Sequence, residues 1–349
     1  MVAKAFIDRG LAGNAFRTGN TGFEKAKGSA DMNIKVVTMY CKFVYFLGCK
    51  VTRFWLLVCI LLSSQLLTQS SMAAPITILT LDETRIGSYT NANGTLNLNF
   101  VTGDSFQTVR EALLDPTNFG PGGTVPRSVA LTSAPAINTN RLGGTDVILL
   151  PAMPRFHFED CERCAIESFV RQGGGLFVSS NYAAHYFADM VGATETYRSK
   201  GVYTKVSNGA SPVANGPFGA LATGTEISNG YLWLFDSLGP NGTDVLVTRD
   251  ADEDIVAASF TLGLGRVVLF NDEELFMNRG VPGMAAARLT PESLMLFLNA
   301  ISYVAPNESF RYVPEDCGCV AASEPEIFML LLLGLAGTWF WWHSRDVYS

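Results

Sequence analysis

The chain has 349 residues, of which 48% are hydrophobic and 16% are charged, and its formal net charge is −7 at pH 7. That length allows one or two domains with a sizeable buried core. Residues 1–73 hold nine of the 25 Lys/Arg and three of the 32 Asp/Glu, so the rest of the chain carries 16 cations and 29 anions, a net charge of −13. This negative net charge argues against nucleic acid and anionic lipid as binding partners.

A short apolar run near the N-terminus predicts a secretory signal. Residues 54–67 (FWLLVCILLSSQLL) follow the basic residues Lys50 and Arg53 and precede small residues at Ser71 and Ala73. This is the pattern of a signal peptide, and we expect cleavage after Ala73. A run of fourteen residues falls short of a membrane span, which favours cleavage over an uncleaved anchor. We therefore assign residues 1–73 to an N-terminal extension and signal peptide, and expect the body of the protein to be exported.

Strand and helix signals alternate through residues 74–305. Residues 76–81 (ITILTL) are expected to form a first buried strand, and 146–150 (DVILL) contain a continuous apolar run, the pattern of a buried parallel strand. Further strands are expected at 125–131, 176–178 and 266–270 with a hairpin of 244–248 and 255–261, and helices at 105–114, 159–172, 183–191 and 291–304. Residues 192–245, rich in Gly, Asn, Ser and Thr, read as loops with short strands. The alternation predicts an α/β fold with a doubly wound, mostly parallel sheet.

The body of the chain contains four cysteines: Cys161, Cys164, Cys317 and Cys319. Thiols of an exported protein are expected to be oxidised, and we favour disulfides that could link the start of the 159–172 helix to a C-terminal stalk at 306–326. The alternative is a four-thiolate zinc site. We predict no metal and no cofactor.

A second apolar run closes the chain and predicts a C-terminal transmembrane helix within residues 327–349. Residues 327–342 (IFMLLLLGLAGTWFWW) nearly span a bilayer, and their aromatic end suits the membrane interface. Together with Ser323, Glu324 and Pro325 and the central 333–335 (LGL), the tail resembles a PEP-CTERM sorting signal, with a serine in place of the first proline and a single arginine, Arg345, in place of a cluster. That resemblance implies a membrane anchor and processing by an exosortase-type enzyme, so that the protein sits at the periplasm or cell surface or is released after sorting. A plain C-terminal anchor is the alternative.

Three stretches, TDVILLPAMP, IESFVRQGGGLFVSSNYA and LGLGRVVLFNDEEL, carry a likeness to a known family. They resemble class I glutamine amidotransferase-like domains, particularly the trehalose-utilisation-type branch, over residues 76–305. The resemblance implies a flavodoxin-like doubly wound sheet. It also places Ser180 where amidotransferases have their cysteine, and Asn271 where they have the histidine base. Asparagine takes no proton at neutral pH, so glutamine amidotransfer is not expected and an enzyme is the less favoured reading.

Ligands of open doubly wound sheets bind at the carboxyl ends of the strands. The polar residues expected there form the candidate cleft: His157, Ser180, Asn181, His185, Asn271, Asp272 and Glu273. The first hypothesis is a non-catalytic domain that binds an unknown ligand or envelope partner at this cleft. The alternatives are a serine hydrolase with Ser180, His157 and Asp272 as its triad, although the Gly-x-Ser-x-Gly elbow is missing, and a structural component of the cell envelope.

The acidic run Asp250, Asp252 and Asp254 mimics the start of a calcium loop. Ile255 occupies the position where such loops need glycine, and no glutamate follows at the twelfth position. A solvated hairpin turn is the favoured interpretation, with weak calcium binding as the alternative.

Overall fold

The computed structural model describes residues 73–86, 88–91, 94–152, 158–249, 252–278, 289–308, 310–315 and 317. The signal peptide before Ala73, the C-terminal tail with Ser323, Glu324 and Pro325, and the single residues His157, Asp250 and Cys319 lie outside these ranges. Within them, no helix is both long and apolar enough to cross a bilayer.

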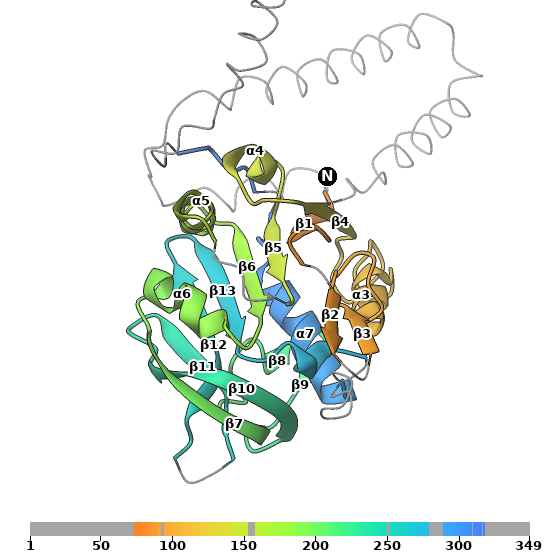
Figure 1. Cartoon of the computed structure of the whole chain (residues 1–349). Helices are drawn as coiled ribbons and strands as arrows, with labels where there is room; N and C mark the ends of the chain where they lie inside the picture. Colours follow the sequence, from red (N-terminus) through yellow and green to blue (C-terminus); the bar gives the residue numbers. More distant parts are fainter. Residues whose placement is uncertain are drawn as a thin grey trace, which may run out of the picture. The chain divides into compact units, whose positions relative to one another are not determined.

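The described residues form a nine-stranded mixed sheet in the order β10-β7-β11-β12-β13-β6-β5-β1-β4 (Figure 1). From β13 to β4 all neighbours are parallel, and from β10 to β13 all are antiparallel. The parallel strands are β1 (Ile76–Leu81), β4 (Val129–Ala134), β5 (Val147–Leu150), β6 (Gly175–Ser179) and β13 (Gly265–Phe270). The antiparallel strands are β7 (Thr194–Val206), β10 (Glu226–Ser237), β11 (Gly242–Thr248) and β12 (Ile255–Leu262). The predicted α/β class is confirmed, with a parallel half joined to an antiparallel half.

Helices cover both faces of the parallel half, as a doubly wound sheet requires. The helices are α3 (Gln107–Leu114), α4 (Thr139–Leu142), α5 (Asp160–Arg171), α6 (Ala183–Val191) and α7 (Pro291–Val304), with a 3-10 turn η1 (Glu274–Phe276). In β13, Gly265 faces α5 so closely that an added Cβ would lie 2.1 Å from the Val170 carbonyl oxygen. The next residue, Arg266, stacks on Tyr303 of α7 at 5.1 Å. Since successive strand residues point to opposite faces, α5 and α7 lie on opposite sides of the sheet.

A cluster of phenylalanines fills the space between the sheet and α7. Phe177 of β6 contacts Phe270, Phe276 and Phe297 with ring centroids 5.3 to 5.7 Å apart, and all four rings are fully buried. Such rings supply much of the apolar area that stabilises a core. Phe276 belongs to η1, so the cluster anchors the 3-10 turn that follows β13 to the core.

Two strands differ from the sequence prediction of loops with short strands at residues 192–245. β7 has 13 residues and β10 has 12, and they pair with each other from Thr194–Ser237 to Lys205–Glu226. Their glycine, serine and asparagine residues have low strand propensity, but cross-strand pairing outweighs propensity. The short pair β8 (Asn215–Gly216) and β9 (Gly219–Ala220) agrees with the short strands expected there, whereas the hairpin of β2 (Ser88–Asn91) and β3 (Gly94–Asn97) was not expected.

Both ends of the α/β domain meet at the amino ends of the parallel strands. The buried Arg127 guanidinium donates to the carbonyl oxygens of Ala74, Pro75 and Pro306 and pairs with the Asp146 carboxylate at 3.2 Å. One arginine therefore holds the start of the domain, its end and the start of β5 together.

A segment after α7 lies along α5. Phe310 and Tyr312 pack on Phe169 with ring centroids 5.3 and 5.9 Å apart, and the Val313 backbone exchanges two hydrogen bonds with the Gln172 amide. We call residues 310–317 the α5 strap.

A disulfide between Cys164 and Cys317, with a Cα–Cα distance of 5.9 Å, fixes the end of the strap. The predicted link between the helix and the C-terminal stalk is confirmed. Cys161 is also disulfide-bonded. The four-thiolate zinc alternative is wrong, because oxidised sulfurs supply no thiolate ligands.

Candidate functional site

The loops that follow β6 and β13 meet at the carboxyl edge of the sheet. The two strands are parallel neighbours with Ser179 opposite Phe270, so the residues after them lie side by side. The Ser179 hydroxyl donates to the Asp272 carbonyl oxygen at 2.7 Å, and the Ser180 amide donates to the Phe270 carbonyl oxygen at 2.9 Å. The structure thus brings together five of the candidate cleft residues: Ser180, Asn181, Asn271, Asp272 and Glu273. We call these five residues the strand-end cluster.

Asn181 holds the Glu273 carboxylate. Its main-chain amide donates to Glu273 Oε2 at 2.8 Å, and its side-chain Nδ2 donates to Oε1 at 3.1 Å. Burial raises the pKa of Glu273 above its ordinary value, with a smaller contribution from the neighbouring Glu274, although the bonds from Asn181 act in the opposite direction. A carboxyl group of this kind takes up a proton more readily than an exposed one.

Asn271 is fully buried, and of its two side-chain amide atoms only Oδ1 forms a hydrogen bond with a described residue. Its Oδ1 accepts the Ala184 main-chain amide at 2.7 Å, which fixes the first turn of α6. Its Nδ2 is buried and has no hydrogen-bond partner among the described residues. A buried donor without a partner costs about 1–3 kcal/mol, so the position calls for an acceptor.

Ser180 and Asp272 are each only 1% exposed. The Ser180 hydroxyl accepts the Tyr182 main-chain amide at 3.2 Å, and Asp272 Oδ1 accepts the Glu274 main-chain amide at 2.9 Å. Both side chains therefore shape their own turns. The third residue of the hydrolase hypothesis, His157, lies outside the described residues.

His185 is directed to the antiparallel half of the sheet. Its Nδ1 lies 3.4 Å from Glu195 Oε1 in β7, and its ring stacks on Trp233 of β10 with centroids 4.3 Å apart and planes inclined by 21°. The contacts of His185 thus lead away from the five residues of the strand-end cluster.

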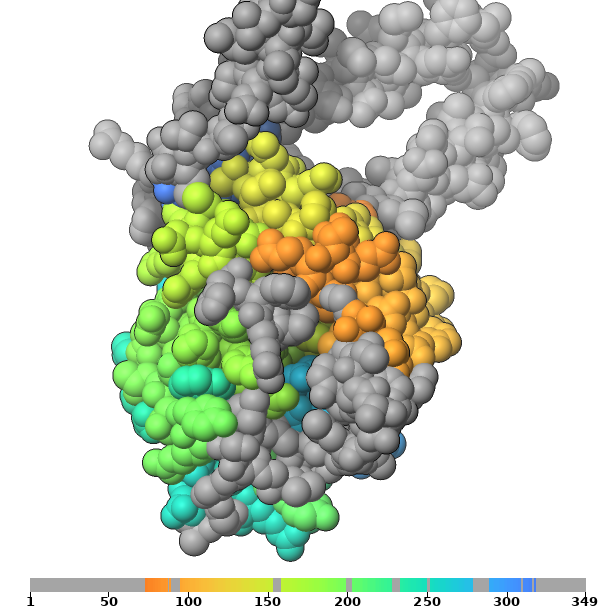
Figure 2. Space-filling view, in the orientation of Figure 1, coloured from red at the N-terminus to blue at the C-terminus, as the bar shows by residue number. Residues whose placement is uncertain are grey.

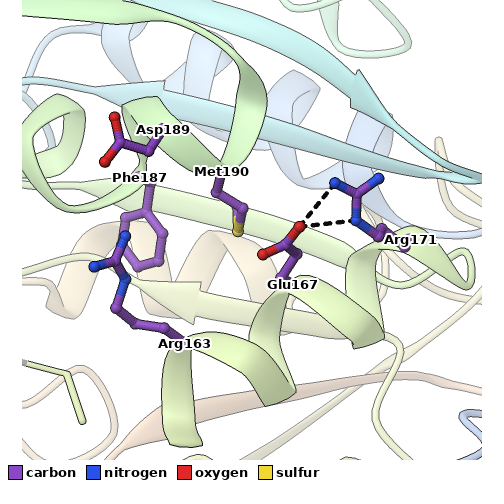
Figure 3. Close-up of a pocket in the computed structure, with 6 residues that line it drawn as sticks. All are labelled: Arg163, Glu167, Arg171, Phe187, Asp189 and Met190. Atoms are coloured by element: carbon purple, nitrogen blue, oxygen red, sulfur yellow. Dashed lines mark hydrogen bonds and ion pairs between the residues drawn. The ribbon is translucent and has the colours of Figure 1, made fainter. Parts of the chain in front are cut away.

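A shallow pocket of ≈ 160 Å³ lies between α5 and α6, away from the strand ends (Figure 3). Arg163, Glu167 and Arg171 enter it from α5, and Phe187, Asp189 and Met190 enter it from α6. Glu167 and Arg171 form an ion pair at 2.7 Å across one turn of α5. Together with Arg163 and Asp189 they give the pocket two positive and two negative side chains, so its net charge is zero. The sequence analysis did not identify this pocket, because it depends on how the two helices pack.

Two acidic side chains of the turn before β12 form ion pairs with basic side chains of β7. Arg198 contacts Asp254 at 3.0 Å, and Lys205 contacts Glu253 at 2.5 Å. The described residues contain no group of three or more His, Cys, Asp or Glu arranged to hold a metal.

No protein-family model matches the chain, and no curated protein matches it. Among solved structures, it is similar to a cytoplasmic protein from Salmonella typhimurium, with 12% identity over 66% of this chain and 99% of the other and a TM-score of 0.41. A ThuA-like protein from Bacteroides uniformis shares 12% identity over 68% of this chain and 93% of its own, with a TM-score of 0.41. Another ThuA-like protein, from Parabacteroides merdae, shares 12% identity over 69% of this chain and 94% of its own, with a TM-score of 0.40. Likenesses at this level assign no function to the chain.

Proposed function

We propose that the chain is an exported, surface- or membrane-anchored α/β domain that binds a ligand at the strand-end cluster and does not catalyse a reaction. The observation that carries the proposal is Asn271, which stands where the resembled enzymes have their base. Its Oδ1 is committed to α6 and its Nδ2 is a buried donor that calls for an acceptor. An amide cannot act as a general base, but it can hold a ligand oxygen.

The Glu273 carboxyl supports a binding role for the same cluster. It lies on the loop that follows Asn271, and its oxygens are already ordered by Asn181. Burial raises its pKa, and its oxygens can accept hydrogen bonds from a ligand. Prepositioned polar groups of this kind fix the orientation of a ligand without covalent chemistry.

The start of the folded domain supports export. Arg127 binds the carbonyl oxygens of Ala74 and Pro75, the first two residues after the proposed cleavage site. Cleavage after Ala73 would leave these contacts intact. The disulfide between Cys164 and Cys317 suits an oxidising compartment.

Thermal-shift titration of the full chain with small amides and carboxylic acids, beginning with glutamine, glutamate and acetamide, tests the binding role. We expect at least one of them to raise Tm of the wild type, because a ligand that binds only the folded state stabilises it. The shift should be lost in Asn271→Leu and kept in Asp189→Asn, a control in the distant α5–α6 pocket. No shift with any of them would contradict the binding role and favour the structural one.

A fluorophosphonate probe tests the absence of catalysis, because it labels activated serines. We expect no labelling of Ser180, since the buried hydroxyl is engaged in its own turn. Labelling that disappears in Ser180→Ala would replace the proposal with a serine hydrolase.

A further inference from the structure

A continuous row of aromatic rings runs from the strand-end cluster onto the antiparallel half of the sheet. Neighbouring ring centroids are 6.3 Å apart for Tyr182–Tyr186, 5.3 Å for Tyr186–His185, 4.3 Å for His185–Trp233 and 5.3 Å for Trp233–Tyr197. We call these five residues the aromatic row. On the face shown in Figure 2, α5, α6 and β7 appear in yellow-green to green at the left, and β1 to β3 appear in orange at the upper right.

The aromatic row is accessible to solvent along much of its length. Tyr197 is 60% exposed and the His185 side chain is 40% exposed, while Tyr182, Tyr186 and Trp233 are half-buried. Large aromatic side chains that remain exposed side by side are unusual, because burial of their apolar area would stabilise the fold. The row therefore has the character of a binding surface.

The charges beside the aromatic row favour a cation. The Oε2 atom of Glu195 is buried and has no hydrogen-bond partner among the described residues, and Oε1 meets only the 3.4 Å contact with His185 there. The face of an aromatic ring carries partial negative charge and attracts cations, and tryptophan attracts them most strongly. The surrounding body has a net charge of −13, so long-range electrostatics point the same way.

Another tyrosine of β7 already forms a cation–π contact. The Arg249 guanidinium lies 5.6 Å from the ring centroid of Tyr203, a residue of β7 that is 55% exposed. Tyr203 thus has its own cation, whereas no cation–π partner is found for Trp233 or Tyr197 among the described residues.

We propose that the aromatic row is a binding site for an organic cation of the methylated-ammonium class. Methylated ammonium groups leave water more readily than a compact primary ammonium, and recognition by aromatic rings is their established mode of binding. Tyr197 supplies an exposed ring, Trp233 supplies a half-buried ring that His185 covers on one face, and Glu195 supplies the charge. This site goes beyond the strand-end cluster, because its anchoring residues lie on β7 and β10.

Calorimetric titration of the full chain with choline and with its neutral carbon isostere, 3,3-dimethyl-1-butanol, tests the proposal. We expect choline to bind at least fivefold more tightly than the isostere, because only the cation gains from the ring faces and from Glu195. Trp233→Leu should abolish choline binding, and Tyr197→Leu and Glu195→Gln should each weaken it about three- to fivefold.

Tyr203→Leu is the matched control, since it removes a tyrosine of the same strand that is exposed to a similar extent, and it should leave choline binding unchanged. If Trp233→Leu does not fold, the affinity of Tyr197→Leu for choline tests the proposal, because the side chain of Tyr197 is mostly exposed. Equal affinity for choline and its isostere, tight binding of a neutral saccharide such as maltose instead of choline, or no binding would each overturn the proposal. Glu273→Gln should retain choline binding; if it loses binding while Tyr197→Leu retains it, the cation lies at the strand-end cluster and the aromatic row is not the site.

Discussion

Asn271 and Glu273 lie two positions apart in the loop after β13, but their surroundings affect their charge differently. Asn271 is neutral at every pH and holds α6 through its Oδ1. Glu273 is titratable, and burial raises its pKa above the ordinary value of 4.5. The cluster is therefore a fixed amide beside a carboxyl group whose charge state depends on pH.

The stability of the protein should depend on pH through Glu273. Because the folded-state pKa is raised, the folded protein binds more protons at this site than the unfolded chain between the two pKa values. Stability therefore falls as pH rises above about 4.5 toward the folded pKa and stays lower above it. We expect the free energy of unfolding of the wild type, relative to Glu273→Gln, to decrease over that range in urea titrations. A difference between the two proteins that does not change with pH would contradict the assignment.

The sequence predicted the residues of the strand-end cluster better than it predicted their surroundings. Two apolar stretches, residues 176–178 and 267–270, precede the residues of the cluster, so these polar residues can be placed at one edge of a parallel sheet. His185 could not be placed, because its partners Glu195 and Trp233 come from strands that the sequence did not reveal. The aromatic row has the same origin: contacts between residues 48 positions apart leave no local pattern.

At the scale of elements, the α5 strap joins the parallel half to the chain after α7. It combines ring packing on Phe169, two hydrogen bonds between Val313 and Gln172, a bond from Ser168 to Glu315 and the Cys164–Cys317 disulfide. The cysteines are 153 positions apart, so the cross-link restricts a large part of the unfolded chain.

Removal of the strap disulfide should destabilise the domain by about 2–5 kcal/mol. The double variant Cys164→Ser/Cys317→Ser avoids a lone thiol that could mispair, and its Tm should be clearly lower than that of the wild type under non-reducing conditions. The control Ser168→Ala keeps the disulfide but removes the bond to Glu315 and the bond from Gln172 Nε2, and should cost about 1–2 kcal/mol. Equal Tm values for the double variant and the wild type would show that the disulfide does not contribute to the stability of the fold.

At the scale of the whole domain, Arg127 is the point where distant parts of the chain converge. Its guanidinium binds three carbonyl oxygens from both ends of the domain and the buried Asp146, which in turn accepts the main-chain amides of Thr77 and Phe310. All of these groups are at the amino edge of the parallel strands, opposite the strand-end cluster.

Arg127→Leu should cost about 3–5 kcal/mol, because it leaves the Asp146 carboxylate buried without a cation. Adding Asp146→Asn should recover part of that loss, so the double-mutant cycle is strongly non-additive in chemical denaturation. Arg171→Leu, which breaks an exposed pair with Glu167, serves as control and should cost about 1 kcal/mol or less. A similar loss for both arginines would contradict a special role for Arg127.

The α5 strap also determines how the domain responds to mechanical load. Residues 310–315 are held by ring packing and hydrogen bonds, contacts that a pull from the end of a chain breaks one at a time. A covalent bond at Cys317 transfers such a pull directly to Cys164, in the middle of α5. Tension on the chain beyond Cys317 therefore reaches α5 before it reaches residues 310–315, and these residues cannot be peeled off from the loaded end while the disulfide is intact.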